Sequence, residues 1–139
     1  MPARDSYHDV VKSALVADGW TITDDPLVLK WGTKDLFVDL GAEQLLAADK
    51  AGQKIAVEVK SFSGASEIND LEKALGQFIL YHDVLGESEP DRRLYLAIAK
   101  EVVDDLFQEP IGQLLLKRER VRLLVFDPDL EVIVQWIPH

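Results

Sequence analysis

The sequence predicts a mixed α/β fold, in which helices flank a mixed β-sheet with a hairpin-rich start. Two observations carry this prediction. Apolar residues recur at three- and four-residue steps over residues 68–85, which is the period of an amphipathic helix. Residues 94–99 (LYLAIA) form a continuous apolar run, typical of a strand that is covered on both faces. The chain of 139 residues has no repeats or long linkers, so we expect one domain over residues 1–139.

The first half of the chain predicts one helix followed by short strands. The apolar stripe of Val10, Val11, Ala14 and Leu15 predicts a helix that begins after Asp5 or Ser6 and ends at Asp18-Gly19. Three β-prone stretches follow, with a turn at Asp24-Asp25-Pro26, and they cover residues 20–23, 27–31 and 36–40 (LFVDL).

The second half alternates strands and helices. The expected elements are a hairpin turning at residues 50–53, a helix over 68–85 stopped by Gly86, a strand over 94–99, helices over 102–107 and 111–117 separated by Pro110, and strands over 121–126 and 131–136 joined by Asp127-Pro128-Asp129. This order places a sheet between layers of helices.

Composition excludes several classes of protein. The chain has no cysteine, so disulfides, thiol nucleophiles and Cys-ligated zinc are ruled out. No apolar run approaches the ~20 residues of a membrane helix, and the charged N-terminal segment is unlike a signal peptide, so we expect a cytoplasmic protein without a membrane span. The formal net charge of -10 disfavours tight non-specific binding to DNA by the chain alone.

One dense basic cluster interrupts this acidic background, formed by Lys117, Arg118, Arg120 and Arg122. It is either a solvated helix end, where cations complement the helix dipole, or a contact for phosphates.

The segment AVEVK carries the chemistry that the sequence predicts most sharply. In a strand, residues two apart share a face and lie roughly 6.6 Å apart, so Glu58 and Lys60 point together, away from the apolar Val57 and Val59. In a central strand both charges would need a partner, a cleft or a metal, because burying an unpaired charge costs several kcal/mol. The alternative is an edge strand with one solvated face.

Asp39 favours the first interpretation. It lies in an apolar strand one hairpin arm before Glu58, and neighbouring strands are about 4.8 Å apart, so the two carboxylates can meet. Two carboxylates with carbonyl and water oxygens suit Mg²⁺ or Mn²⁺. A nearby Lys60 would orient or deprotonate a water, or neutralise developing charge on a phosphoryl group. Alternatively, Asp39 caps the turn into Gly41.

The pattern of Asp39, followed after one hairpin by Glu58-x-Lys60 on the next strand, resembles the signature of the PD-(D/E)XK nuclease superfamily. The segments RDSYHDVVKSALVADGWTITDDP, VDLGAE, IAVEVKSF, ALGQF, RRLYLAI and VFDPDLEVIVQWI are similar to the XisH-type excision controlling factors of the fdxN element. The resemblance covers about 130 residues and implies a restriction-endonuclease-like fold. These cyanobacterial proteins accompany a site-specific recombinase that removes a DNA element during heterocyst development, often beside an XisI-type small protein.

The resemblance implies roles for individual residues. Asp39 and Glu58 would bind Mg²⁺ or Mn²⁺, with the Val59 backbone carbonyl as a further ligand. Lys60 would be the catalytic lysine. Gln77, in ALGQF, matches a glutamine that recurs on the helix after the lysine strand, although an amide at a helix–sheet contact is an equal alternative.

Further candidates are ambiguous. In many superfamily members an acid on the first helix completes the site, and Asp9 or His8 is the candidate here, with Asp5 one turn earlier. Glu43 either replaces or supplements Asp39 or caps its own segment. Ser61 is either a phosphate contact or a strand-end hydroxyl.

Three functions follow as hypotheses. The first is a metal-dependent DNA phosphodiesterase, possible as a homodimer. The second is a non-catalytic accessory that uses the same scaffold to bind an XisI-type protein or the recombinase complex, which the acidic charge favours. The third is a structural domain whose Glu58 and Lys60 form a surface ion pair. The three tryptophans are expected in the core, because base stacking would require them exposed and clustered.

Overall fold

A computed structural model describes residues 4–45 and 52–138 of the chain. The helices are α1 (His8–Ala17), α2 (Glu67–Ser88), α3 (Lys100–Leu106) and α4 (Pro110–Lys117). The strands are β1 (Thr21–Asp24), β2 (Leu27–Trp31), β3 (Lys34–Val38), β4 (Leu40–Leu45), β5 (Gly52–Val59), β6 (Arg92–Ala99), β7 (Leu123–Asp127) and β8 (Val132–Ile137). Among the helices in this part of the chain, none is long and apolar enough to cross a bilayer.

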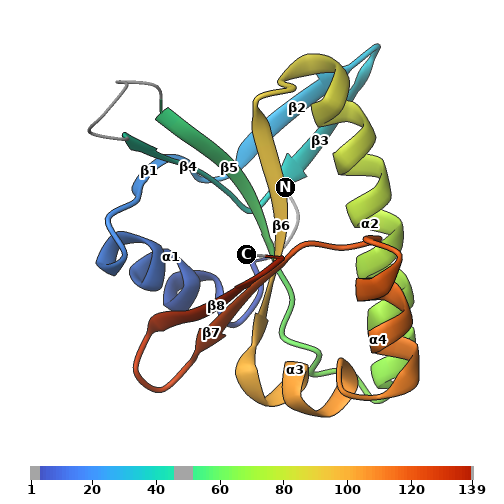
Figure 1. The fold of residues 1–139 in the computed structure, drawn as a ribbon. Coiled ribbons are helices and arrows are strands. Elements are labelled where there is room, and N and C mark those ends of the chain that lie inside the picture. Colours follow the sequence, from blue (N-terminus) through green and yellow to red (C-terminus); the bar gives the residue numbers. More distant parts are fainter. Residues whose placement is uncertain (1–3, 46–51, 139) are drawn as a thin grey trace.

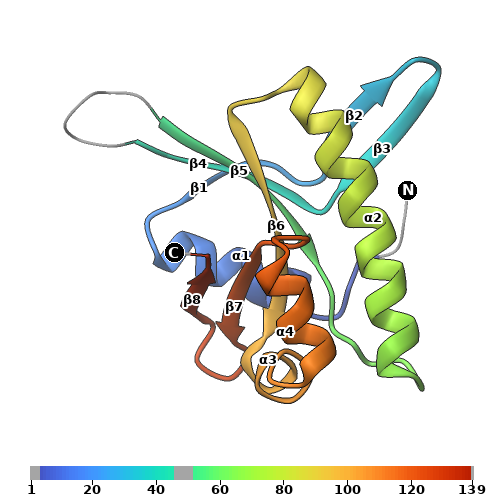
Figure 2. The same cartoon turned by 45° about the vertical axis from the view of Figure 1, so that its right-hand side comes forward.

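Six strands form one mixed sheet in the order β1-β4-β5-β6-β7-β8, and β2 and β3 form a separate two-stranded sheet. The central strands β5, β6 and β7 are parallel, whereas the outer pairs β1/β4, β4/β5 and β7/β8 are antiparallel. Figures 1 and 2 show α2, α3 and α4 on one side of this sheet and α1 on the other. The predicted sheet flanked by helices is confirmed.

The two faces of the sheet bury two separate cores. On the α1 side, Val11 and Leu15 pack against Val57 and Val59 of β5. On the α2 side, the core combines residues of α2, α3 and α4 with β6, β7 and the β2–β3 hairpin. Both faces of β5 are therefore covered from Ile55 onward, and β5 is a central strand. The interpretation of β5 as a solvated edge strand is wrong.

Helix α2 begins where a capping serine is followed by an amphipathic stretch. The Ser66 hydroxyl accepts a hydrogen bond from the Asn69 backbone N–H at 3.2 Å. The helix does not stop at Gly86 as the sequence predicts, but continues to Ser88. The buried side chains of Val84 and Leu85 hold this last turn on the sheet, and packing outweighs the low helix propensity of one glycine.

The apolar run LFVDL also differs from expectation, because it contains the end of one strand and the start of another. Strand β3 ends at Val38, Asp39 forms a bend, and β4 begins at Leu40. The β2–β3 hairpin packs on α2 through Leu27, Leu29 and Val38 rather than continuing the large sheet. The predicted β4–β5 hairpin is confirmed by its pairing, but Gly52 and Gln53, which were predicted in its turn, already belong to β5. Residues 50 and 51 of the predicted turn lie outside the described residues.

The basic cluster lies at the end of α4. Lys117 is in the last helical turn, Arg118 is the C-cap, and Arg120 follows in the exposed connection to β7. This position agrees with the interpretation as a solvated helix end, where the negative end of the helix dipole favours cations.

Candidate functional site

Asp39 and Glu58 meet at the carboxyl end of β5, on the α2 side of the sheet. The register pairs Leu40 with Val57, which places the bend at Asp39 beside Glu58. The Asp39 backbone N–H donates to Glu58 Oε1 at 3.3 Å, and the Val59 N–H donates to Asp39 Oδ2 at 2.7 Å. Reciprocal bonds between the two segments therefore fix both carboxyl groups, as the sequence predicts.

Lys60 completes the group one residue beyond the end of β5. Its Nζ lies 4.0 Å from Glu58 Oε2, and its side chain is half-buried while that of Glu58 is buried. The Lys60 backbone N–H donates to the Ala97 carbonyl of β6, so the main chain that presents the lysine is still tied to the sheet. The predicted common face of Glu58 and Lys60 is confirmed.

The electrostatics of the site favour a bound proton or cation. Burial first, and then the charge of Asp39, raise the pKa of Glu58 to about 8 against the opposing charge of Lys60. Burial also raises the pKa of Asp39, against the hydrogen bond from Val59 and the charges of His8 and Lys60. One lysine thus leaves the two adjacent carboxyl groups short of positive charge.

Helix α2 supplies two further polar side chains one turn apart. Gln77 Oε1 is buried and has no hydrogen-bond partner among the described residues. Tyr81 is buried, and its pKa is raised to about 12 by burial first and then by the charges of Glu58 and Asp39. Tyr81 was missed from the sequence, although its four-residue spacing from Gln77 on one helical face is a signal that could have found it.

A second network borders the site from α1. His8 is buried, its Nε2 lies 2.8 Å from Asp25 Oδ1, and Lys12 Nζ donates to Asp25 Oδ2 at 2.8 Å. Burial opposes ionisation of Asp25, but the hydrogen bonds from Lys12 and His8 leave its pKa lowered. The charge of His8 also lowers the pKa of Asp39, so His8 is the α1 residue with an electrostatic influence on the carboxylates.

The other two first-helix candidates, Asp9 and Asp5, differ in where they lie. The Asp9 side chain is 85% exposed and pairs with Arg4, so it does not join the carboxylates. Asp5 instead accepts hydrogen bonds from the backbone N–H groups of Tyr7 and Ser61. The predicted role of Asp9 fails because the start of α1 turns it to the surface, whereas Asp5 lines a pocket together with Lys60 and stays a candidate beside the site.

Glu43 is also outside the site. It lies opposite Lys54 in the register of β4 and β5 and pairs with it at 3.7 Å. Four residues separate it from Glu58 along the strand direction, which corresponds to roughly 13 Å. The idea that Glu43 replaces or supplements Asp39 is therefore wrong.

The donors at the site suit a hard divalent cation. The buried Glu58 and half-buried Asp39 carboxylates both have raised pKa values, and their mutual repulsion is lost when a cation lies between them. Mg²⁺ and Mn²⁺ prefer such oxygen ligands. Within residues 4–45 and 52–138, no group of three or more His, Cys, Asp and Glu side chains could hold an ion. Asp39 and Glu58 would therefore need carbonyl and water oxygens to complete the coordination.

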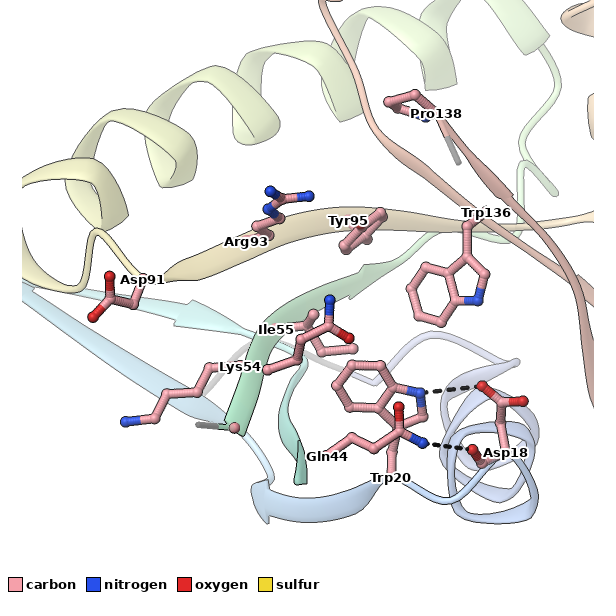
Figure 3. A pocket seen from close by; sticks show the side chains of 12 residues that line it. Asp18, Trp20, Gln44, Lys54, Ile55, Asp91, Arg93, Tyr95, Trp136 and Pro138 are labelled. Atoms are coloured by element: carbon pink, nitrogen blue, oxygen red, sulfur yellow. Dashed lines mark hydrogen bonds between the residues drawn. The ribbon is translucent and has the colours of Figure 1, made fainter. Parts of the chain in front are cut away.

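A larger pocket lies on the opposite face of the sheet (Figure 3). It has a volume of about 910 Å³, and its lining includes Trp20, Tyr95 and Trp136. Trp136 lies 4.8 Å from Tyr95 and 5.8 Å from Trp20 between ring centroids. Trp20 and Tyr95 are buried and Trp136 is half-buried, which agrees with a role in the core. Trp31 is 52% exposed on β2, so its predicted core position is wrong.

The fold and the site define a mixed α/β domain with a carboxylate pair and a lysine at the end of a central sheet strand. A family model described as "XisH protein" matches residues 1–134, and the chain belongs to this XisH family.

Two crystal structures are similar over almost the whole chain. An XisH family protein from Nostoc punctiforme PCC 73102 is 41% identical, with a TM-score of 0.85 over 96% of this chain and 99% of the other. An fdxN element excision controlling factor protein from Anabaena variabilis is 46% identical, with a TM-score of 0.87 and the same coverage. A comparison with curated proteins finds no match.

Proposed function

We propose that this protein is a metal-dependent DNA phosphodiesterase with a PD-(D/E)XK-type site on a restriction-endonuclease-like scaffold. The observation that carries the proposal is the convergence of Asp39, Glu58 and Lys60 at the carboxyl end of β5. Two carboxylates beside one lysine provide the groups that metal-assisted hydrolysis of a phosphodiester needs.

Asp39 and Glu58 would hold Mg²⁺ or Mn²⁺, with the Val59 carbonyl as the further ligand that the family resemblance implies. Bound there, the cation would polarise the phosphate and favour attack by water. Lys60 neutralises charge that develops on the phosphoryl oxygens or orients the water, and its 4.0 Å separation from Glu58 places it at the edge of the carboxylate pair. Gln77, one turn before Tyr81 on α2, has a buried side-chain oxygen without a partner among the described residues, which can accept a hydrogen bond from a water.

Similarity to the Anabaena variabilis protein supports a place for this activity in the excision of a DNA element. In that setting we expect a cytoplasmic protein that acts with an XisI-type small protein and a site-specific recombinase complex. A basic partner would strengthen the DNA affinity that a net charge of -10 weakens. A homodimer would cut both strands.

The test is cleavage of plasmid DNA in Mg²⁺ or Mn²⁺ by the wild-type protein, with and without its protein partner. Lys60→Ala and Glu58→Gln should abolish nicking. Lys34→Ala, which changes an exposed lysine in the β2–β3 hairpin, should not. Nicking that survives both site substitutions would reject the assignment and would indicate a contaminating nuclease.

The net charge of -10 favours a second candidate, a non-catalytic accessory that binds the excision complex through the same scaffold. In that case Lys60→Ala would leave both excision and partner capture intact. Loss of excision with retained capture in Lys60→Ala would support catalysis instead.

A further inference from the structure

A small polar pocket adjoins the carboxylate site on the side of the loop between β5 and α2. It has a volume of about 160 Å³ and is lined by Asp5, Lys60, Ser61, Phe62, Ser63, Gly64, Asp70 and Lys73. Lys60 belongs both to this pocket and to the pair with Glu58. The pocket and the carboxylates are therefore neighbours joined by one side chain.

The loop that forms the pocket is held in a specific shape. Phe62 adopts a φ of 56°, a left-handed conformation that is uncommon for a non-glycine residue, and its side chain packs on the α2-side core. A side chain at Gly64 would come within 2.7 Å of the Asp70 carboxylate, whose Oδ2 accepts the Gly64 N–H at 2.9 Å. Asp5 holds the Ser61 N–H at 2.9 Å. The loop is thus held in place by Asp5, which precedes it in the sequence, and by Asp70, which follows it.

The two acids of the pocket already accept hydrogen bonds from this loop. Asp5 accepts from two backbone N–H groups and Asp70 from one, so their oxygens support the wall of the pocket. The groups that remain to meet a ligand are the hydroxyls of Ser61 and Ser63, which lie 3.1 Å apart, and the ammonium groups of Lys60 and Lys73. Hydroxyls and ammonium groups are donors that suit phosphate oxygens.

The pocket also continues the polar face of α2. Lys73, Gln77 and Tyr81 follow one another at four-residue steps and therefore lie on one side of the helix. The pKa of Tyr81 responds to the charges of Glu58 and Asp39, and Lys73 lies two turns away on the same side, towards the exposed start of α2. Because Lys60 lines the pocket and lies 4.0 Å from Glu58, a nucleic-acid strand held at the carboxylates would meet this pocket next.

We propose that this pocket binds a backbone phosphate of the DNA strand next to the one that is cleaved, with Lys73 and the Ser61 and Ser63 hydroxyls as its positioning groups. The assignment rests on the proposed function, because it takes the substrate to be DNA. It adds a second anchor that sets the register of the strand relative to Glu58 and Lys60.

The experiment measures the affinity of the full chain for a short labelled DNA duplex in Ca²⁺, as a function of salt, and the cleavage rate in Mg²⁺. Lys73→Ala should weaken binding by roughly three- to tenfold and reduce the slope of log K against log[salt] by about one. Gly64→Ala should also weaken binding, because it displaces Asp70 and the loop without removing a charge. Lys34→Ala is the matched control and should change neither quantity.

Each assignment can fail separately. Cleavage by wild type and Lys73→Ala at equal rates and with equal affinity would overturn the phosphate pocket and leave the nuclease proposal intact. Binding that depends on Lys73 but not on Lys34, without any cleavage, would support the pocket and overturn catalysis. Equal losses in Lys73→Ala and Lys34→Ala, or no duplex binding by wild type, would overturn the pocket.

Discussion

The Asp39 backbone N–H donates a hydrogen bond to the carboxylate of Glu58, and the side chain of Asp39 in turn accepts from the residue after Glu58. The two acids are thus locked together through the main chain, 19 residues apart in sequence. This geometry keeps the buried Glu58 and the half-buried Asp39 carboxyl groups adjacent even though their charges repel. The arrangement costs stability, and that cost is measurable.

Folding stability should fall as pH rises through the neutral range, and Glu58 should cause part of the fall. The folded-state pKa of Glu58 is about 8, above its ordinary value of 4.5, so the folded protein keeps a proton that the unfolded chain loses. The contribution of Glu58 to the free energy of unfolding is complete below pH 4.5 and is lost as the pH rises to about 8. Between these values the free energy falls by at most about 1.4 kcal/mol per pH unit. Denaturant unfolding of Glu58→Gln should show a flatter pH profile than wild type, and parallel profiles would contradict this.

Mg²⁺ or Mn²⁺ should stabilise the protein and displace a proton at pH 7. A cation that binds only the folded state adds RT ln(1 + [L]/Kd), or about 2.7 kcal/mol at a hundredfold excess over Kd. Because the pKa of Glu58 is about 8, binding at pH 7 should release close to one proton, which calorimetry in two buffers measures. Asp39→Asn should remove both effects, whereas Glu43→Gln should retain them, since Glu43 pairs with Lys54 outside the site.

Tyr81→Phe should lower the cleavage rate by about five- to tenfold, because it removes one hydroxyl beside the carboxylates and retains the ring that packs in the core. Tyr95→Phe is the matched control, since Tyr95 is buried on the opposite face of the sheet. Steady-state kinetics and thermal unfolding of both variants separate a role in the site from one in packing. Equal rates in the two variants would assign Tyr81 to packing alone.

Two glycine substitutions should change stability in opposite directions. A Cβ at Gly112 of α4 would collide with the Leu106 carbonyl and the Phe107 backbone at the end of α3, so Gly112→Ala should cost about 1–3 kcal/mol. A Cβ at Gly76 of α2 meets nothing within 4 Å, so Gly76→Ala should stabilise by roughly 0.5–1 kcal/mol. Denaturant midpoints measure both, and a stabilising Gly112→Ala would show that α3 and α4 are not in close contact.

The sequence predicts the part of the site that lies on strands. The alternation in AVEVK places Glu58 and Lys60 on one face, because side chains alternate along any strand whatever surrounds it. The approach of Asp39 follows from short-range hairpin pairing. The sequence does not predict the bend at Asp39, since LFVDL is apolar apart from Asp39 and has no Gly or Pro, and the break depends on the β2–β3 hairpin packing against α2.

The parts that could not be predicted depend on packing between distant elements. His8 meets Asp25 only because α1 folds back on the turn before β2, and a single sequence carries no signal for that contact. Trp31 is exposed because the β2–β3 hairpin forms a separate two-stranded sheet. The apolar composition of β2 resembles that of a buried strand and gives no sign of this. Helix α2 passes Gly86 because tertiary burial of Leu85 outweighs local propensity.

The hydrogen bond from Ser61 to Asp5 spans 56 positions of the chain and ties the segment before α1 to the residue that follows Lys60. Asp5 also orders the first turn of α1 through Tyr7. Removing the amino-terminal residues through Asp5 would therefore loosen both the segment that follows β5 and the start of α1. A purification tag is better fused at the carboxyl terminus, away from the hydrogen bond between Asp5 and Ser61.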